Sequence, residues 1–113
     1  MKKIEAIIRT EKLDVVMSAL ERAGYPGVTL TEVRGHGKQR GVREEWHGQY
    51  QPQTFTSKTK IEIVVHDGDA NRVLTAIMEA ARTQGFGDGK IFISTIEDAI
   101  RIRTQQRGDV ALD

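Results

Sequence analysis

The sequence contains no cysteine, which excludes disulfide bonds and thiol chemistry and fits a reducing compartment. An excess of one charge is also missing, because 17 Lys and Arg residues stand against 16 Asp and Glu residues and leave a net charge of +1. A protein with this balance has no global field that would attract nucleic acid or an anionic membrane, so any anion site must be local.

Long apolar runs are absent as well. The run from Ile4 to Ile8 is interrupted by Glu5 and followed by Arg9, so it is too short for a signal-peptide core or a membrane span. We therefore expect a cytoplasmic protein that does not insert directly into a membrane. A chain of 113 residues with 38% hydrophobic content predicts a single domain over residues 1–113.

Hydrophobic periodicity predicts secondary structure in the order strand, helix, strand, strand, helix, strand. The predicted strands are residues 3–8, 28–33, 60–65 and 90–95, and the predicted helices lie between Thr10 and Gly24 and over residues 73–81. This order predicts an α+β fold of the ferredoxin-like βαββαβ type, an antiparallel sheet with both helices on one face. Residues 96–104 alternate again and predict a further extended segment, with Arg101 and Arg103 on one face.

The predicted sheet face opposite the helices is too apolar to remain in water. Alternation places four apolar residues among three charged ones on this face, namely Ile7, Val33, Val64 and Phe92 among Glu5, Lys60 and Glu62. An apolar sheet face of this kind predicts burial against further copies of the chain.

A polar stretch from Arg34 to Lys58 separates the second and third predicted strands, and it is far longer than a hairpin connection of about 2–5 residues. Its isolated aromatic residues, Trp46, Tyr50 and Phe55, are candidate anchors for a partner. The alternative is a solvated loop whose aromatic residues fold back on the body of the domain.

The glycine-rich segment from Gly85 to Lys90 is a candidate phosphate cradle, because glycines let backbone N–H groups approach an anion. It does not have the P-loop spacing, and the alternative is an ordinary turn. Cations that would converge on such a cradle are Lys38, Arg40, Lys58, Arg101 and Arg103. The alternative for the two last arginines is a solvated strand face.

Several segments together resemble the PII nitrogen-regulatory signal-transduction family in register over nearly the whole chain. They are KKIEAII (2–8), TEV (31–33) before Gly35 and Gly37, Gln39 with Gly41, Lys58 with KIEIVV (60–65), AART (80–83), GDGKIF (87–92) and IRIRT (100–104). The resemblance implies a homotrimer that binds ATP or ADP in each cleft between subunits and acts on its partner through a T-loop at about residues 36–57. A C-terminal segment follows at about residues 104–113.

The resemblance also implies which residues bind each ligand. Nucleotide binding is implied for Thr29, Gly37, Lys38, Gln39, Val64, Gly87, Asp88, Gly89, Lys90, Arg101 and Arg103. Binding of 2-oxoglutarate is implied for Arg9, Gln39, Lys58 and Gly87. Gln39 is also implied to complete the coordination shell of a Mg²⁺ ion that is bound to the ATP phosphates. Oxygen ligands of this kind suit Mg²⁺. The T-loop residues implied to meet a partner are Arg43, Glu44, Trp46, His47 and Tyr50.

The function implied is that of a non-enzymatic regulator of a target in nitrogen metabolism or transport, such as an ammonium channel, another transporter or a metabolic enzyme. The alternative is a divergent sensor of nucleotide state or of another metabolite, such as bicarbonate, that controls a different target.

The chain departs from the family pattern at named positions. Gln51 stands where the family commonly has a tyrosine that is uridylylated, with Tyr50 one position earlier, and His47 stands where relatives that plug an ammonium channel have arginine. Gln84 and Gln105 each occupy a position where the family commonly has glycine.

Two other classes fit the residues less well. A nucleic-acid-binding domain on this plan needs aromatic residues on its central strands, where this chain has Ile and Val with Phe92 as the one candidate. An enzyme needs a nucleophile with a base or a set of metal ligands, and the three histidines lack metal-ligand spacing. Glu44 and Glu45 beside His47 are either a metal site or part of a solvated charged loop.

Overall fold

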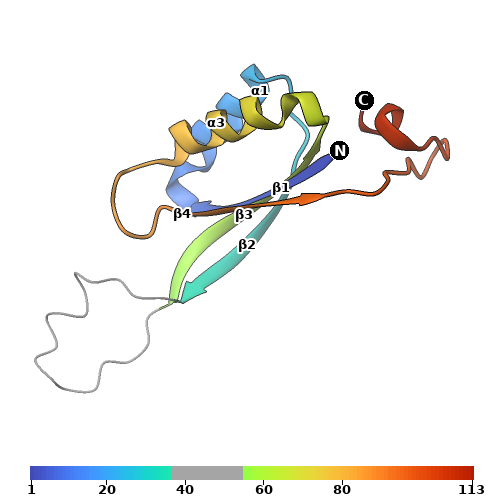
Figure 1. The fold of residues 1–113 in the computed structure, drawn as a ribbon. Coiled ribbons are helices and arrows are strands. Elements are labelled where there is room, and N and C mark those ends of the chain that lie inside the picture. Colours follow the sequence, from blue (N-terminus) through green and yellow to red (C-terminus); the bar gives the residue numbers. More distant parts are fainter. Residues whose placement is uncertain (37–54) are drawn as a thin grey trace, which may run out of the picture.

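The computed structural model describes residues 1–36 and 55–113, which form a four-stranded antiparallel sheet with two helices on one face (Figure 1). The elements are β1 (Lys2–Arg9), α1 (Leu13–Arg22), β2 (Thr29–His36), β3 (Phe55–Val65), α3 (Ala70–Ala81) and β4 (Gly89–Thr95), with short 3₁₀ helices η1 (Thr10–Lys12), η3 (Asp67–Asp69) and η4 (Gly108–Leu112). The strands lie in the order β2-β3-β1-β4. The predicted ferredoxin-like βαββαβ fold is confirmed.

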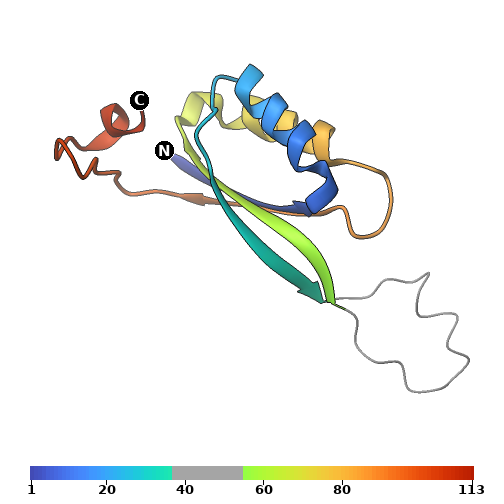
Figure 2. The ribbon, with the colours of Figure 1, turned by 180° about the vertical axis from the view of Figure 1, so that it is seen from behind.

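The hydrophobic core lies between the sheet and the two helices, which Figure 2 shows on the same side of the sheet from behind. Alternate residues of β1 are buried there, and each helix contributes residues three or four positions apart, which form one apolar stripe. The largest fully buried side chains are Ile4, Ile8, Val16, Leu20, Ile61, Val65, Val73 and Ile77. Neither of the two helices is long and apolar enough to cross a membrane in the described part of the chain.

The strand register places the predicted apolar residues on the face without helices. Directly opposed residues share a face in an antiparallel sheet, and the pairs here are Ile7 with Lys60, Val33 with Lys58, Val64 with Lys3 and Phe92 with Glu5. Phe92 is 53% exposed. Charged side chains on this face pair with each other, since Lys3 Nζ lies 3.1 Å from Glu62 Oε2 and 3.4 Å from Glu5 Oε1. The composition of this face was therefore predicted correctly.

The hairpin of β2 and β3 extends beyond the other strands at the end of the sheet where β1 finishes (Figure 1). Its last pairs are Arg34 with Ser57 and His36 with Phe55, whose rings lie 5.2 Å apart. Both strands are longer than predicted, because the polar residues of 34–36 and 55–59 pair across the hairpin although they carry little apolar periodicity. β2 and β3 therefore include the first and the last residues of the stretch predicted as T-loop.

Gly89, the first residue of β4, lies directly against the backbone of β1. A Cβ atom built on Gly89 would be 1.7 Å from the Ile7 main-chain oxygen, and the Gly89 φ angle is +104°. Both the conformation and the close approach therefore require glycine. This contact fixes where the segment between α3 and β4 meets the sheet.

We predict a graded loss of stability when alanine replaces three glycines. Gly89→Ala should lower the free energy of unfolding by at least about 3 kcal/mol, because it combines a left-handed φ with overlap against β1. Gly24→Ala, with φ +89° and nothing within 4 Å, should lower it by about 1 kcal/mol. Gly27→Ala also has open space around it and should change stability by less than about 0.5 kcal/mol. Urea denaturation measures all three, and equal effects at Gly24 and Gly89 would contradict the close approach.

Candidate functional site

Two cations lie side by side at one end of the sheet. Arg9, the last residue of β1, is paired with Lys58 of β3. Both side chains reach the turn between α3 and β4: Arg9 Nε donates to Asp88 Oδ1 at 3.1 Å, Arg9 Nη2 donates to the Phe86 main-chain oxygen, and Lys58 Nζ donates to the Gly87 main-chain oxygen. The structure thus brings together Arg9, Lys58 and Gly87, which the sequence implied for one anion.

The turn of residues 83–88 is held by the Asp88 carboxylate. Asp88 accepts hydrogen bonds from the Thr83 amide at 2.8 Å, the Gln84 amide at 3.0 Å and the Thr83 hydroxyl. These donors, the Thr83 hydroxyl first among them, and the Arg9 guanidinium hold the pKa of Asp88 well below its usual range. Asp88 therefore ties the turn to β1 through Arg9. No role for Thr83 is predictable from the sequence, because nothing in its spacing from Asp88 marks it as a donor.

The Lys58 ammonium group is enclosed, since this residue is 8% exposed. Burial lowers the pKa of Lys58, and the neighbouring Arg9 guanidinium lowers it further, while Glu11 and Asp88 act in the opposite direction. Two cations here face the Asp88 carboxylate and two neutral main-chain oxygens. An incoming carboxylate that replaced those neutral oxygens would therefore gain charge-assisted hydrogen bonds from both cations.

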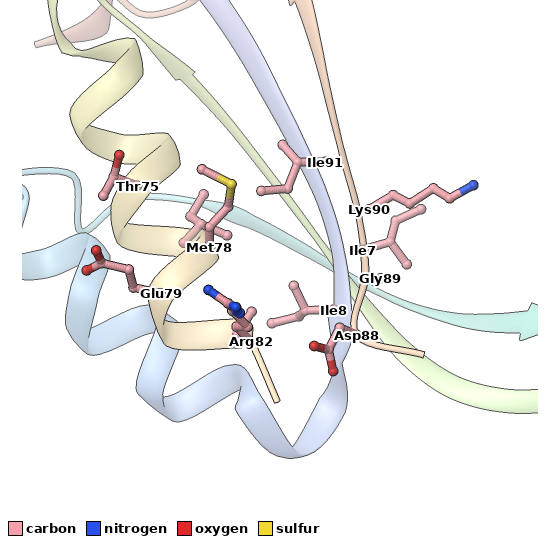
Figure 3. A pocket seen from close by; sticks show the side chains of 12 residues that line it. Ile7, Ile8, Thr75, Met78, Glu79, Arg82, Asp88, Gly89, Lys90 and Ile91 are labelled. Carbon is pink, nitrogen blue, oxygen red and sulfur yellow. The ribbon is translucent and has the colours of Figure 1, made fainter. Parts of the chain in front are cut away.

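A cleft of about 570 Å³ lies beside this cluster, between α3 and β4 (Figure 3). Its lining is largely apolar and includes Ile8, Met78 and Ile91. Figure 3 shows the Lys90 side chain extending from β4 away from α3, and its pairing with Ile7 places it on the helix-free face of the sheet. The ammonium group of Lys90 therefore points away from the cleft.

The other predicted nucleotide residues lie at the opposite end of the sheet. Val64 is paired with Lys3 near the start of β1, Thr29 begins β2, and Arg101 and Arg103 follow the end of β4. β4 has seven residues, and at about 3.3 Å per residue its two ends are about 20 Å apart. Within one subunit, Arg101 and Arg103 therefore do not converge on the glycine cradle, and their convergence between subunits stays a prediction.

The prediction of an extended strand over residues 96–104 is also wrong. β4 ends at Thr95, Ile100 forms an isolated bridge with Arg107, and residues 102–104 form a turn. Arg107 Nη2 lies 2.7 Å from Asp98 Oδ2, and the Arg107 guanidinium lowers the pKa of Asp98. This ion pair closes residues 98–107 into a compact turn, which the apolar alternation of the sequence did not reveal.

Glutamine adopts a left-handed backbone at two places in the described ranges 1–36 and 55–113. Gln84 has φ +67° and Gln105 has φ +62°, and they are the two described non-glycine residues with a positive φ. Both are positions where the resemblance placed glycine, the residue that adopts a left-handed backbone most readily.

The remaining predicted residues lie outside the described ranges. They are Gly37, Lys38 and Gln39 for nucleotide and Mg²⁺, the loop cation Arg40, and Arg43, Glu44, Trp46, His47 and Tyr50 for a partner.

We predict that Asp88 contributes stability that is lost in acid. The folded pKa lies below the unfolded value of about 3.9, so ionised Asp88 stabilises the fold above about pH 4, and the contribution disappears as the pH falls through the depressed folded pKa. Urea denaturation between pH 7 and pH 3 should show a smaller acid-dependent loss in Asp88→Asn than in the wild type. Thr83→Val should be intermediate, and the exposed Asp14→Asn should match the wild type. Parallel curves for Asp88→Asn and the wild type would contradict the role of this carboxylate.

Comparison with known proteins gives a consistent result. The family model for nitrogen regulatory protein P-II matches residues 1–106. Nitrogen regulatory protein P-II 2 of Methanothermobacter thermautotrophicus is 50% identical over 112 residues, covering 99% of this chain and 97% of that protein. Nitrogen regulatory protein P-II of Rhodospirillum rubrum is 49% identical, covering 99% and 100% respectively. A crystal structure of Arabidopsis thaliana PII bound to citrate has a TM-score of 0.80 at 40% identity, covering 98% of this chain and 88% of that one. The chain belongs to the family of nitrogen regulatory protein P-II.

Proposed function

We propose that this protein is a non-enzymatic, cytoplasmic regulator that binds ATP or ADP between the subunits of a homotrimer. With Mg-ATP bound it also takes up 2-oxoglutarate, and it acts through its T-loop on a target in nitrogen metabolism or transport. Membership of a family of nitrogen regulatory proteins supports the regulatory part of this proposal.

The observation that carries the proposal is the division of the nucleotide residues into two half-sites. One end of the sheet holds Gly87, Gly89 and Lys90, and the other end holds Arg101 and Arg103. The proposed polyphosphate site combines the backbone cradle with Arg101 and Arg103, and these two parts lie at opposite ends of the sheet in one subunit. In a ring of identical subunits, one end of each subunit meets the other end of its neighbour, so every interface can contain one complete site.

The face of the sheet without helices supports an assembly of this kind. It carries Ile7, Val33, Val64 and the half-exposed Phe92, and four of its charged residues, Lys3, Glu5, Lys60 and Glu62, form ion pairs with each other. Burying such a face against two further copies would remove apolar surface from water while these four charges keep their partners.

We predict that two defective variants complement each other. Lys90→Ala damages one half-site and Arg103→Ala the other, and each variant alone should lose on the order of 1.5–3 kcal/mol of ADP binding free energy. When equal amounts are unfolded together and refolded, about a quarter of the interfaces should combine two undamaged half-sites. Calorimetry should then detect sites of wild-type affinity at about that fraction.

As the control, each variant is unfolded and refolded alone under the same conditions. Neither sample should show sites of wild-type affinity. Complete absence of wild-type sites in the mixed sample would place the nucleotide within one subunit. Unchanged affinity in both separate variants would remove these residues from the nucleotide site.

The Arg9 and Lys58 cluster supports the proposed site for 2-oxoglutarate. Its two cations contact neutral main-chain oxygens of Phe86 and Gly87, which a carboxylate can replace with a gain in charge complementarity. The related Arabidopsis PII was crystallised with citrate, another small polycarboxylate. Mg²⁺ would supply an ion shared by ATP phosphates, the keto acid and Gln39.

We predict that Lys58→Met abolishes binding of 2-oxoglutarate to the Mg-ATP form while leaving most of the ATP affinity. The substitution removes the charge facing the distal carboxylate and one hydrogen bond to Gly87, while Asp88 still holds the turn of the glycine cradle and Arg101 and Arg103 are unchanged. Lys60→Met is the matched control, because Lys60 lies on the same face of β3 two positions further on. Titration of 2-oxoglutarate into each Mg-ATP complex measures the effect.

The same titration decides between the two functions that the residues allow. If the wild type binds Mg-ATP but releases no heat with 2-oxoglutarate, the protein reads nucleotide state or another metabolite, such as bicarbonate. In either case the T-loop residues Arg43, Glu44, Trp46, His47 and Tyr50 are proposed to contact the target, an ammonium channel, another transporter or a metabolic enzyme.

A further inference from the structure

The segment of residues 108–113 folds back onto Arg101. The Arg101 guanidinium donates to Gln106 Oε1 at 2.8 Å, to the Val110 main-chain oxygen at 3.1 Å and to the Asp113 main-chain oxygen. Figure 1 shows this segment as a short helix, η4, that turns back toward the start of β1. One face of the guanidinium fork is therefore occupied by oxygen atoms of the chain itself.

The same segment has a second anchor on the body of the domain. His66, which follows β3, has its Nε2 atom 3.0 Å from Asp113 Oδ1 and its Nδ1 atom 3.8 Å from Asp109 Oδ1. The Asp113 carboxylate contributes most to raising the pKa of His66, and Asp109 and Asp69 of η3 act in the same direction. Residues 108–113, which we call the latch, are thus held by Arg101 on one side and His66 on the other.

Arg103 provides a contrast within the same turn. It is exposed, and it forms no hydrogen bond or ion pair with any residue in the ranges 1–36 and 55–113. Of the two arginines in the second half-site, one is engaged by the latch and the other is available to a ligand. Contact with the latch is therefore specific to Arg101.

We propose that the latch is an autoinhibitory segment that competes with nucleotide phosphate for Arg101. This inference rests on the proposed function, because it requires Arg101 to be a phosphate ligand. The latch offers Arg101 the main-chain oxygens of Val110 and Asp113, whereas a nucleotide phosphate offers several anionic oxygens to the same guanidinium, so nucleotide competes with the latch for Arg101. The latch reduces the apparent affinity in proportion to the time it is closed.

Reciprocity follows from this competition. If the closed latch weakens nucleotide binding, then bound nucleotide must open the latch by the same factor. Opening removes Asp113 and Asp109 from His66 and leaves Asp69 as its acidic neighbour. The protonation of His66 therefore reports the position of the latch from a place outside the phosphate site.

The first test compares ADP affinity in variants that weaken the anchor without touching Arg101. Asp113→Asn and His66→Gln should each tighten ADP binding by about three- to tenfold, which corresponds to a latch closed for about 70–90% of the time. The double variant should gain no more than His66→Gln alone, because His66→Gln already removes the contact that Asp113→Asn breaks. Asp14→Asn on α1 removes the same charge far from the latch and should leave the affinity unchanged. Equal affinities in the wild type and all variants would overturn the proposal.

The second test measures the pKa of His66 by NMR with and without saturating ADP. The raised pKa of His66 in the free protein should fall toward its ordinary value when ADP binds, and in Asp113→Asn it should already be lower without nucleotide. A pKa of His66 that stays raised in the ADP-saturated protein would overturn the latch while leaving the nucleotide site intact. Absence of ADP binding in the wild type and in every variant would instead refute the proposed function and the latch with it.

Discussion

The Asp88 carboxylate is the interaction on which the geometry of the site depends. It gathers the Thr83 hydroxyl and two amides on one side and the Arg9 guanidinium on the other, and so joins the turn after α3 to the end of β1. Gly89 allows this contact, because a residue without a side chain can lie directly against the Ile7 main-chain oxygen. The Gly87 oxygen is then directed at Lys58, so one carboxylate determines where both cations of the cluster lie.

The two ends of the sheet differ in how their cations are engaged by the rest of the chain. At the end where β1 finishes, Arg9 and Lys58 donate hydrogen bonds to neutral main-chain oxygens. An anion that replaced these oxygens would bind the two cations more strongly. At the other end, Arg101 is already engaged by neighbouring chain oxygens, and Arg103 is exposed. A regulator assembled from such subunits would combine a half-site that favours an anion with a half-site whose access is controlled.

Much of the fold could be predicted from periodicity, and the failures have physical causes. Strict alternation in β1 and helical spacing in α3 marked the core because apolar burial determines both. The outer part of the β2–β3 hairpin carries polar residues on both faces, so pairing there leaves no periodic signal. Ile100 and Ile102 alternate with arginines in the manner of a strand, yet the Asp98 to Arg107 ion pair and the left-handed Gln105 close that segment into a turn.

The site could be predicted only in part, because the residues predicted for the nucleotide lie at both ends of the sheet in one subunit. Arg9, Lys58 and Gly87 meet within the subunit through the pairing of β1 with β3, a contact that strand order implies. The arginines after β4 cannot meet the glycine cradle, since the length of β4 separates them. A sequence motif indicates which residues bind one ligand, but it does not indicate whether those residues belong to the same subunit. When a fold places such residues at opposite ends of a sheet, the mismatch itself indicates a ligand bound between copies, which rotational symmetry can satisfy at every interface.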